Sequence, residues 1–394
     1  MSNAGADNAA ADEATGLPLS GIRVIEFSHM VMGPTCGMIL ADLGAEVIKI
    51  EPPEGDRTRN LPGLGIGFFR SFNRNKKSVV LDVDRPEGHA AAIELIAASD
   101  VVIENFRPGR MASLALDHAS LHDRFPALIY VSHKGFLPGP YEHRTALDEV
   151  VQMMGGLAYM TGPPGRPLRA GTSVNDIMGG LFGALGVLAA LQERQRTGRG
   201  QEVQSALFEN CVFLNAQHMQ QFAMTGEPPP PMPARVSSWG VYDIFTLAND
   251  EQLFVAAVSD RQWQLLCKVL DAPELAADPA LATNSLRVAA RATMLPRLRA
   301  LLVQHDIATL ESQLEAAALP YARIVRPDEL FDDPHLRESG GLAAMQSEDG
   351  TMTEIPLLPL LLGGRRLKVR RPLPKVGEHS EEVFRALRAA SRET

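Results

Sequence analysis

Short apolar segments alternate with helical segments over the first half of the chain, and this alternation constrains the fold more than any other feature. A buried strand over Ile22–Phe27 leads through a loop to a helix over Thr35–Leu43, which Gly44 ends. A second helix starts near Pro86, a residue type favoured in a first helical turn. Strands that alternate with helices pair in parallel, so the pattern predicts an α/β fold with a doubly wound parallel sheet. The other predicted strands are 45–51, 78–84, 100–106 and 127–136.

The rest of the chain predicts a second domain, since 394 residues exceed the size at which one hydrophobic core usually splits. Helical patterns cover 147–160 and 175–194, and 202–222 has the pattern of a strand followed by a helix. A hairpin that turns at Asn249–Asp250, followed by helices from Asp260 past Glu315, predicts a smaller mixed α+β domain.

The sequence GEPPPPMPA marks the boundary between these parts, because four consecutive prolines favour an extended, semi-rigid connection. The start of the chain is rich in Ala, Asp, Asn and Gly, a composition typical of a disordered tail. We therefore expect a tail over 1–17, a large domain over 18–225, a linker over 226–236, a small domain over 237–335 and a return to the large domain over 336–394.

The composition excludes several functional classes. A net charge of -9 disfavours binding to nucleic acids and to anionic membranes, and the longest apolar run, around Leu181–Leu191, is too short to span a bilayer. Cys36, Cys211 and Cys267 lie far apart, with no cluster at metal-ligand spacing, which predicts a reducing compartment and no metal site. The residues through Thr15 lack the pattern of a signal peptide, so we expect a cytoplasmic protein.

The carboxyl ends of the predicted strands are where a ligand should bind, and cationic residues gather there. The loop after Phe27 lacks the GxGxxG spacing of a dinucleotide site, so NAD and FAD are not expected. The cations between residues 57 and 110 form either a solvated face or a pocket for a polyphosphate ligand. They are Arg57, Arg59, Arg70, Arg74, Lys76, Lys77, Arg85, Arg107 and Arg110.

Five segments, taken together and in this order, resemble the class III CoA-transferase family. They are GIRVIEFSHMVMGPTCGMILADLGAEVIKIEPPEGDRTR, NKKSVVLDV, ENFRPG, the helix that opens with SVND and leads to TGRGQ, and PLPKVGEHSEEVF. The family contains the formyl-CoA, carnitine and bile-acid CoA-transferases and the α-methylacyl-CoA racemases, and the resemblance runs from about Leu19 to Phe384. It implies a Rossmann-like large domain built from both chain ends, a smaller α+β domain, coenzyme A bound to the large domain, and an interlocked homodimer.

The residue that matches the family's nucleophile is Asp176, which precedes a long Gly- and Ala-rich segment. A carboxylate can attack a thioester carbonyl, form a mixed anhydride and then hold CoA as an aspartyl thioester. A helix N-terminus favours the ionised form that this chemistry requires. The competing interpretation is a plain helix N-cap, and a residue at this position can serve both purposes. Four glycines flank this position and either allow close helix packing or let backbone N–H groups approach an oxyanion: Gly155, Gly156, Gly179 and Gly180.

The resemblance also implies a set of CoA contacts. Cations suit the phosphates, and an aromatic ring suits adenine or pantetheine. Two positions depart from the formyl-CoA type. Val31 stands where that type has a Gln, and Ser113 stands where it has an Arg. Arg110 lies one helical turn from Ser113 and can take the place of that Arg. The single glycine in VSSWGVYD, where that type has a glycine-rich loop, also argues against formyl or oxalate transfer. The matching positions are His29, Val31, Met32, Asn75, Lys76, Lys77, Asn105, Phe106, Arg107 and, as the substitute, Arg110.

Two alternatives to CoA transfer remain open. An acyl-CoA racemase or isomerase needs a His just before Asp148, where this chain has Leu147, although His143 is close by. We expect Asp148 to cap the helix that follows it. A non-catalytic CoA-binding protein is the other alternative.

The substrates are predicted only by class. A cation near the nucleophile would suit an acid with a second carboxylate, so the expected donor is succinyl-CoA. The expected acceptor is a small dicarboxylate such as itaconate or mesaconate, or a related sulfinate. The candidate cationic residues are His29, Arg144, Arg166 and Arg169, and solvation at the surface is the alternative for each Arg.

Overall fold

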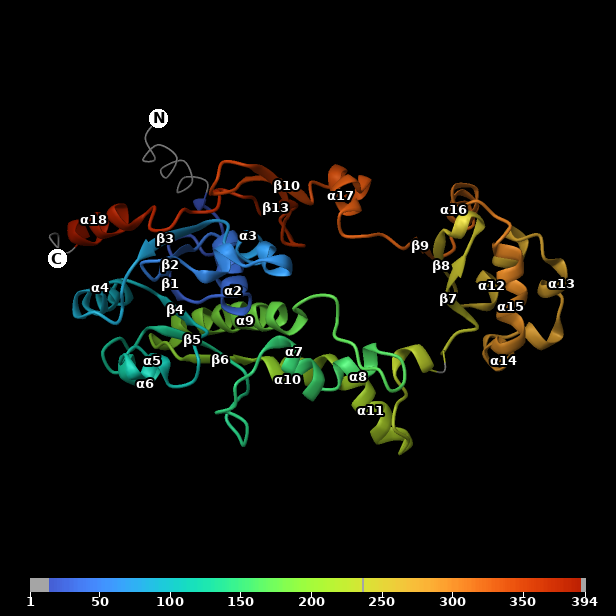
Figure 1. Ribbon diagram of the computed structural model, residues 1–394, viewed down its shortest axis with the longest axis horizontal. Coiled ribbons are helices and arrows are strands. Elements are labelled where there is room, and N and C mark those ends of the chain that lie inside the picture. Colours follow the sequence, from blue (N-terminus) through green and yellow to red (C-terminus); the bar gives the residue numbers. More distant parts are fainter. Residues whose placement is uncertain (1–13, 236, 391–394) are drawn as a thin grey trace. The chain divides into compact units, whose positions relative to one another are not determined.

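The computed structural model describes residues 14–235 and 237–390 and divides into two compact units (Figure 1). Unit 1 consists of the chain up to Ala234 together with the chain from Pro334 onward, so both chain ends contribute to it. Unit 2 is the intervening segment, Arg235–Asp333. Within the part of the tail that is described, Leu17 N–H donates to the Ala14 carbonyl, and Leu17 packs against the core.

A six-stranded parallel sheet forms the centre of unit 1, as the alternating pattern predicts. Its strand order is β3-β2-β1-β4-β5-β6, so consecutive strands are added first on one side of β1 and then on the other. The order therefore reverses between β1 and β4, and such a switch point leaves a crevice at the carboxyl ends of the strands. The strands are β1 (Arg23–Phe27), β2 (Glu46–Glu51), β3 (Lys76–Val80), β4 (Val101–Glu104), β5 (Ile129–Lys134) and β6 (Glu202–Ala206).

Helices bury both faces of this sheet because successive strand residues point to opposite sides. In β1, Val24 belongs to the core beneath α2 (Met32–Asp42) and α9 (Val174–Thr197), whereas Ile25 belongs to the core on the other face. That second face is covered by α4 (Pro86–Ala97), α5 (Arg110–Ser113), α6 (His118–Leu121) and the C-terminal helix α18 (Ser380–Ala390), which packs on β3. The helix predicted from Thr35 begins three residues earlier, at Met32.

Helix α9 packs unusually closely on α2 because two of its residues have no side chain. An added Cβ would lie 2.1 Å from Met32 Cε at Gly179 and 2.7 Å from the Met32 carbonyl oxygen at Gly180. Among the described residues, α9 is the one helix long and apolar enough to cross a membrane, but 44% of its apolar window is buried inside the protein. It ends at Gly198, which has a φ of 71°.

The segment predicted as one helix over 147–160 is two short helices, α7 (Asp148–Met154) and α8 (Leu157–Thr161). Gly156 separates them with a φ of 85°, a conformation that favours glycine and breaks a helix. After β6, unit 1 continues with α10 (Leu207–Leu214) and α11 (Ala216–Thr225).

Unit 2 confirms the predicted hairpin and helices. Strands β7 (Val241–Thr246) and β8 (Gln252–Ala257) pair antiparallel, and Asn249 and Asp250 both have a φ of 61° in the turn. Strand β9 (Tyr321–Arg323) extends this sheet, and Trp263 is fully buried in the core. The helices are α12 (Asp260–Val269), α13 (Pro273–Ala276), α14 (Asn284–Ala289), α15 (Arg291–Leu302) and α16 (Ile307–Ala316).

The remaining elements of unit 1 are short. The chain after unit 2 forms α17 (Pro334–Glu338) and two antiparallel hairpins before it reaches α18. The first hairpin pairs β10 (Leu342–Gln346) with β11 (Met352–Pro356), and the second pairs β12 (Leu361–Leu362) with β13 (Arg365–Arg366). Helix α3 (Ile66–Phe72) lies between β2 and β3 in the sequence.

Candidate active site

The switch point between β1 and β4 brings together residues from two loops. The backbone N–H of His29 donates to Asn105 Oδ1 at 3.0 Å, and Asn105 Nδ2 donates to the His29 carbonyl at 2.7 Å. The His29 and Phe106 rings stack with their centroids 5.6 Å apart. Three of the residues implied by the family resemblance therefore form one structure at the place where a doubly wound sheet binds ligands.

A cavity of about 240 Å³, here called the Asp176 cavity, opens beside this pair. It joins the loops after β1, β4 and β5 to the starts of α7 and α9. The predicted residues Met32, Arg107 and Asp176 all line it, so the fold brings the expected nucleophile to the expected CoA contacts. The full lining is His29, Met30, Met32, Asn105, Phe106, Arg107, Pro108, His133, Lys134, Gly135, Arg144, Thr145, Ala146, Leu147, Asp148, Asp176 and Leu207.

Asp176 is not the N-cap of its helix, which corrects that interpretation of the sequence. The cap position is Ser173, whose side chain makes no capping bond, and Asp176 is the third residue of α9. The helix is capped instead by Asp148, whose Oδ2 accepts the N–H of Asn175 at 2.8 Å and that of Asp176 at 3.1 Å. The sequence predicts that Asp148 caps the helix that follows it, α7. In the structure Asp148 is the first residue of α7, and it caps α9 instead.

The electrostatics of Asp176 differ from the sequence expectation. Burial and, to a smaller extent, the negative charge of Asp148 together raise the pKa of its carboxyl from 3.8 to about 7. The sequence predicts that the α9 N-terminus favours the ionised form, but desolvation and a like charge outweigh that effect here. The side chain is only partly buried and contributes to the cavity wall, so its carboxylate remains accessible from that side.

Three cationic side chains line the Asp176 cavity: Arg107, Lys134 and Arg144. None of them forms an ion pair with a carboxylate of the residues that the structure describes, and Arg144 lies over the Tyr141 ring at 5.1 Å. The two other arginines predicted near the nucleophile, Arg166 and Arg169, are not unpaired cations of this cavity. Arg169 is paired with Glu149, and Arg166 does not line the cavity. The cavity therefore combines the carboxylates of Asp148 and Asp176 with cations that can bind an anionic ligand.

A second cavity, of about 360 Å³, lies at the carboxyl ends of β1, β2 and β3. It shares His29 and Phe106 with the Asp176 cavity, so the two are adjacent. Arg57 and Arg110 line it, and Arg110 donates to both Asp84 oxygens, at 2.9 and 2.7 Å. We call it the Arg110 cavity.

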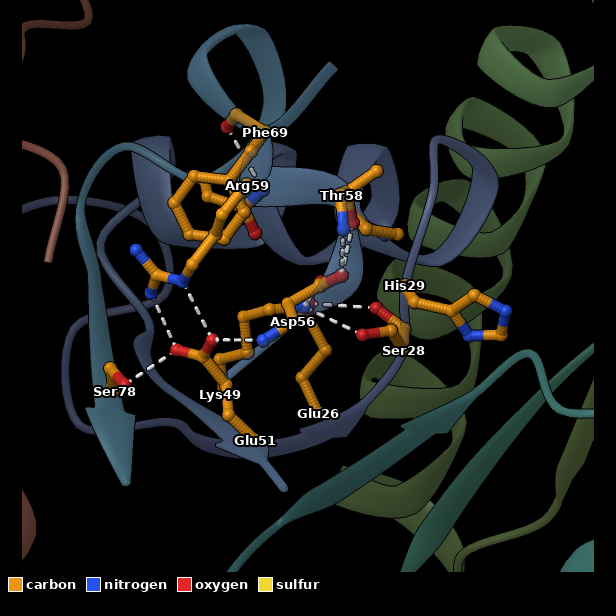
Figure 2. Close-up of polar contacts among 12 residues, drawn as sticks. Glu26, Ser28, His29, Lys49, Glu51, Asp56, Thr58, Arg59, Phe69 and Ser78 are labelled. Carbon is orange, nitrogen blue, oxygen red and sulfur yellow. Dashed lines mark hydrogen bonds and ion pairs between the residues drawn. The ribbon is translucent and has the colours of Figure 1, made fainter. Parts of the chain in front are cut away.

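A network of buried charges supports the wall of the Arg110 cavity (Figure 2). Lys49 Nζ lies 2.9 Å from Asp56 Oδ2 and donates to the Ser28 carbonyl at 2.6 Å. Although burial favours the protonated form of Asp56, Lys49 and hydrogen bonds from Thr58 lower its pKa to about 2. The network thus fixes the loop after β2 to the loop after β1.

The same network extends toward the C-terminal part of unit 1. Figure 2 shows Arg59 and Ser78 meeting at Glu51. Arg59 donates to both oxygens of Glu51, at 2.8 and 2.6 Å, and to the Pro374 carbonyl at 2.9 Å. Its guanidinium lies 3.8 Å from the centre of the Phe69 ring. Arg59 thereby ties the chain near Pro374 to the end of β2.

Asn75, Lys76 and Lys77, which the resemblance implies as CoA contacts, do not line either of these two cavities. Lys76 is fully buried and bonded to Glu26, Asn73 and the Pro34 carbonyl, and burial lowers its pKa to about 8. Lys77 is paired with Glu46 and Glu382, and Asn75 donates to Asp42. The physical reason is strand direction: the three residues stand at the start of β3, whereas the cavities lie beyond the carboxyl ends of the strands.

Two further predicted positions also have structural roles. Val31 is buried, with 1% of its surface exposed, and directly precedes α2. The Ser113 hydroxyl donates to the Arg110 carbonyl at 2.7 Å. Gly155 packs against Cys211, and Gly179 and Gly180 pack against α2, so these three glycines follow the helix-packing interpretation.

Sequence reasoning misses Lys134, Arg57 and the role of Asp148 at α9. Lys134 ends the predicted strand 127–136 and could have been selected by its place at a carboxyl end. Arg57 stands out in the sequence only as one of the many cations between residues 57 and 110. The Asp148 contact joins residues 27 and 28 positions apart, and no local pattern encodes such a pairing.

Comparison with known proteins identifies the family. A sequence profile described as CoA-transferase family III matches residues 19–380. The chain belongs to this family. It is 34% identical to the succinate–glutarate CoA-transferase of Agrobacterium fabrum, over 95% of this chain and 97% of the relative. It is 32% identical to the succinyl-CoA:mesaconate CoA-transferase of Haloarcula hispanica, over 93% of this chain and 95% of the relative.

Solved structures agree with this assignment. A CaiB/BaiF family protein from Brucella suis superimposes with a TM-score of 0.84 at 32% identity, covering 94% of this chain and 99% of the other. A hypothetical protein from Mycobacterium tuberculosis superimposes with a TM-score of 0.82 at 30% identity, over 93% and 99% of the two chains. The chain is thus an enzyme of the CoA-transferase class, and CoA is the substrate of its family.

Proposed function

We propose that the enzyme transfers CoA from an acyl-CoA donor to a carboxylic acid through covalent intermediates on Asp176. One observation carries the proposal: the Asp176 carboxylate lines the same cavity as the His29–Asn105 pair, Arg107 and Phe106. The pair marks the ligand-binding switch point of the sheet, so a CoA thioester held there would have its acyl group beside a carboxylate.

The proposed reaction starts with attack of Asp176 on the thioester carbonyl. A C–O bond forms, the C–S bond breaks, and CoA leaves as its thiolate while the acyl group remains on Asp176 as a mixed anhydride. The CoA thiolate then attacks the aspartyl carbonyl, which releases the first acid and leaves CoA on Asp176 as a thioester. The acceptor carboxylate repeats these two steps in reverse order and leaves with CoA. Each step exchanges one acyl bond for another, so no oxidant or reductant is required.

We propose succinyl-CoA as donor and a small dicarboxylate, such as itaconate or mesaconate, or a related sulfinate, as acceptor. The names of both relatives above contain succinate or succinyl-CoA, and each names a second dicarboxylate. In this chain, Arg144 and Lys134 are the cavity cations that can bind the far carboxylate of such an acyl group. Arg144 is the better match for a planar carboxylate, because a guanidinium binds it with two parallel hydrogen bonds.

We also propose that the protein acts as an interlocked homodimer in the cytoplasm, with its two units as the large and small domains. Large apolar side chains on α9, α10 and α11 support a partner surface, because a monomer rarely exposes so many together. Leu181 is 53% exposed, Leu185 57%, Phe213 65% and Phe222 50%. A second copy of this chain would cover them.

An activity screen tests the proposed reaction. The purified enzyme is mixed with succinyl-CoA or acetyl-CoA and a panel of acids, and new CoA esters are identified by mass spectrometry. CoA transfer to a dicarboxylate supports the proposal. Deuterium exchange at the α-carbon without an acceptor acid would instead support a racemase or isomerase, and CoA binding without turnover across the panel would support a non-catalytic protein.

A further inference from the structure

We propose that Asp148 is a positioning residue, which fixes the orientation of Asp176 and sets the pH range in which Asp176 can act. The inference rests on the proposed function of Asp176. It starts from the contact between the two residues, because Asp148 holds the first turn of α9 from outside the helix through the N–H groups of Asn175 and Asp176.

Asp148 is itself held in place by a chain of hydrogen bonds. Gln152, one turn further along α7, donates from its Nε2 to Asp148 Oδ1. Gln152 Oε1 accepts the backbone N–H of Ala170 at 2.7 Å, in the loop that leads to α9. Gln152 is fully buried and Asp148 is 7% exposed, so water does not compete strongly for these bonds. The start of α9 is thus connected through two side chains to the loop that precedes it.

This arrangement has a consequence for the charge of the site. The free N–H groups at a helix N-terminus are a natural anion site, and Asp148 already occupies those of Asn175 and Asp176. A substrate oxyanion must therefore rely on the cavity cations rather than on these N–H groups. Asp148 also places a second negative charge next to the reactive carboxylate, which favours the protonated form of Asp176.

Other titratable groups face Asp176 from the surrounding elements, but none repeats this contact. His29 and His133 are kept neutral by burial, which lowers the pKa of both and brings that of His133 to about 3. The cations oppose Asp148, since a positive charge favours the ionised form of Asp176. The titratable groups that line the cavity with Asp176 are His29 from the loop after β1, Arg107 from the loop after β4, His133 and Lys134 from β5, Arg144 from the loop before α7 and Asp148 from α7. Cys211 on α10 interacts electrostatically with Asp148.

Three variants separate the charge of Asp148 from its hydrogen bonds. Asp148→Asn keeps an oxygen for the α9 N–H groups but removes the charge. The new amide N–H at position 148 would face the amide N–H of Gln152, so two donors would meet and their hydrogen bond would be lost. The double variant Asp148→Asn with Gln152→Glu restores a donor–acceptor pair and moves the negative charge one helical turn away. Asp148→Ala removes both the charge and the cap. Glu149→Gln is the matched control, because it removes the neighbouring carboxylate of α7, which is exposed and paired with Arg169.

The readout is modification of Asp176 by a water-soluble carbodiimide, which reacts with protonated carboxyl groups, measured by peptide mass spectrometry as a function of pH. It needs no turnover, so it stands or falls separately from the CoA-transfer proposal. We expect the transition to fall by about one pH unit or more in Asp148→Asn and Asp148→Ala, by less in the double variant, and not at all in Glu149→Gln. Unchanged transitions in both Asp148→Asn and Asp148→Ala would overturn the inference.

Kinetics then distinguish positioning from simple support of the fold. In Asp148→Asn the acid limb of kcat/KM should shift to lower pH together with the labelling transition. In Asp148→Ala the same shift should be accompanied by a fall in kcat of about 10-fold or more, because the first turn of α9 loses its cap while the CoA contacts remain. A uniform loss of activity in Asp148→Asn, with the acid limb where it is in the wild type, would also contradict the inference.

Discussion

The Asp148 carboxylate accepts the backbone N–H of Asp176 at 3.1 Å, so two carboxylates from different helices lie together at one wall of the Asp176 cavity. Neither residue is the cap that its local sequence suggests, because Asp148 caps the helix of Asp176. A carboxylate at a helix N-terminus normally has a lowered pKa, but burial, together with the negative charge of Asp148, raises the pKa of Asp176. The reactivity of Asp176 and the stability of the surrounding fold should both depend on such contacts.

The wild-type rate should depend on pH through Asp176. Attack requires the ionised carboxylate, and burial together with Asp148 raises the pKa of Asp176 to about 7. Because the reactive form is the deprotonated one, kcat/KM should rise about 10-fold per pH unit below pH 7 and level off above it. Steady-state kinetics between about pH 5.5 and about pH 8.5 measure this. A profile that is flat across this range would contradict the assignment.

Replacing Asp176 should stabilise the protein at neutral pH. A pKa that rises from 3.8 to about 7 on folding means that the folded state binds this proton more tightly, so the free energy of unfolding falls as the pH rises between these values. Asp176→Asn removes that effect. We expect its unfolding free energy to exceed the wild type's by up to about 4 kcal/mol at pH 8, and by less at pH 5, where the cost has only partly developed. Equal differences at the two pH values would contradict this.

Arg144 should select acyl groups that carry a second carboxylate. It lines the Asp176 cavity without a carboxylate partner among the described residues. A hydrogen bond to a charged group contributes about 1.5–3 kcal/mol, so Arg144→Gln should raise KM for succinyl-CoA about 10- to 100-fold and leave acetyl-CoA nearly unaffected. Arg166→Gln, which alters an arginine that does not line the cavity, is the control. Equal losses with both donors would argue against selection by Arg144.

A side chain at Gly180 should disturb the packing of α9 on α2 and lower the stability of the protein. A Cβ there would approach the Met32 carbonyl oxygen to 2.7 Å, and overpacking of this kind costs about 1–3 kcal/mol. Gly180→Ala should therefore destabilise unit 1 and reduce turnover by displacing the start of α9. Gly67→Ala is a control inside helix α3, where an added Cβ meets nothing within 4 Å. That change should leave stability unchanged or raise it by about 0.5–1 kcal/mol.

The buried pair of Lys49 and Asp56 should be costly to break from one side. Lys49→Met leaves Asp56 buried without its cation, which we expect to cost about 3–5 kcal/mol. Urea unfolding followed by circular dichroism measures this, because both tryptophans, Trp239 and Trp263, lie in unit 2 and their fluorescence would not report on unit 1. The exposed Lys268→Met should change stability by less than about 0.5 kcal/mol. Similar effects of the two changes would contradict a structural role for Lys49.

Much of the fold follows from local patterns in the sequence. Strand β4 opens with the continuous apolar run Val101–Ile103, which is typical of parallel strands buried on both faces, and the alternation of such strands with helices predicts the sheet. The hairpin at Asn249–Asp250 is also predictable, since these residue types tolerate a positive φ. The split of 147–160 at Gly156 is not, because a helical pattern on both sides hides a change in chain direction.

The family resemblance places Asp176 and Met32 correctly at the cavity, and the strand ends account for several other residues of the site. His29, Asn105 and Phe106 come directly after β1 and β4, and the sheet topology brings those ends together. The buried pairing of Lys76 with Glu26 is not predictable, because Glu26 is 50 positions away in the sequence. Pairings between distant residues, including Asp148 with the start of α9, depend on the tertiary fold and leave no local signal.

Trapping the covalent intermediate would show whether Asp176 is the nucleophile. The enzyme is incubated with succinyl-CoA and then with hydroxylamine or borohydride, and its peptides are analysed by mass spectrometry. We expect a mass change confined to Asp176, absent without the CoA ester and absent in Asp176→Asn, whose transfer activity should fall at least about 10³-fold. An unmodified Asp176 peptide in an active wild-type enzyme, together with full activity in Asp176→Asn, would contradict nucleophilic catalysis by this residue.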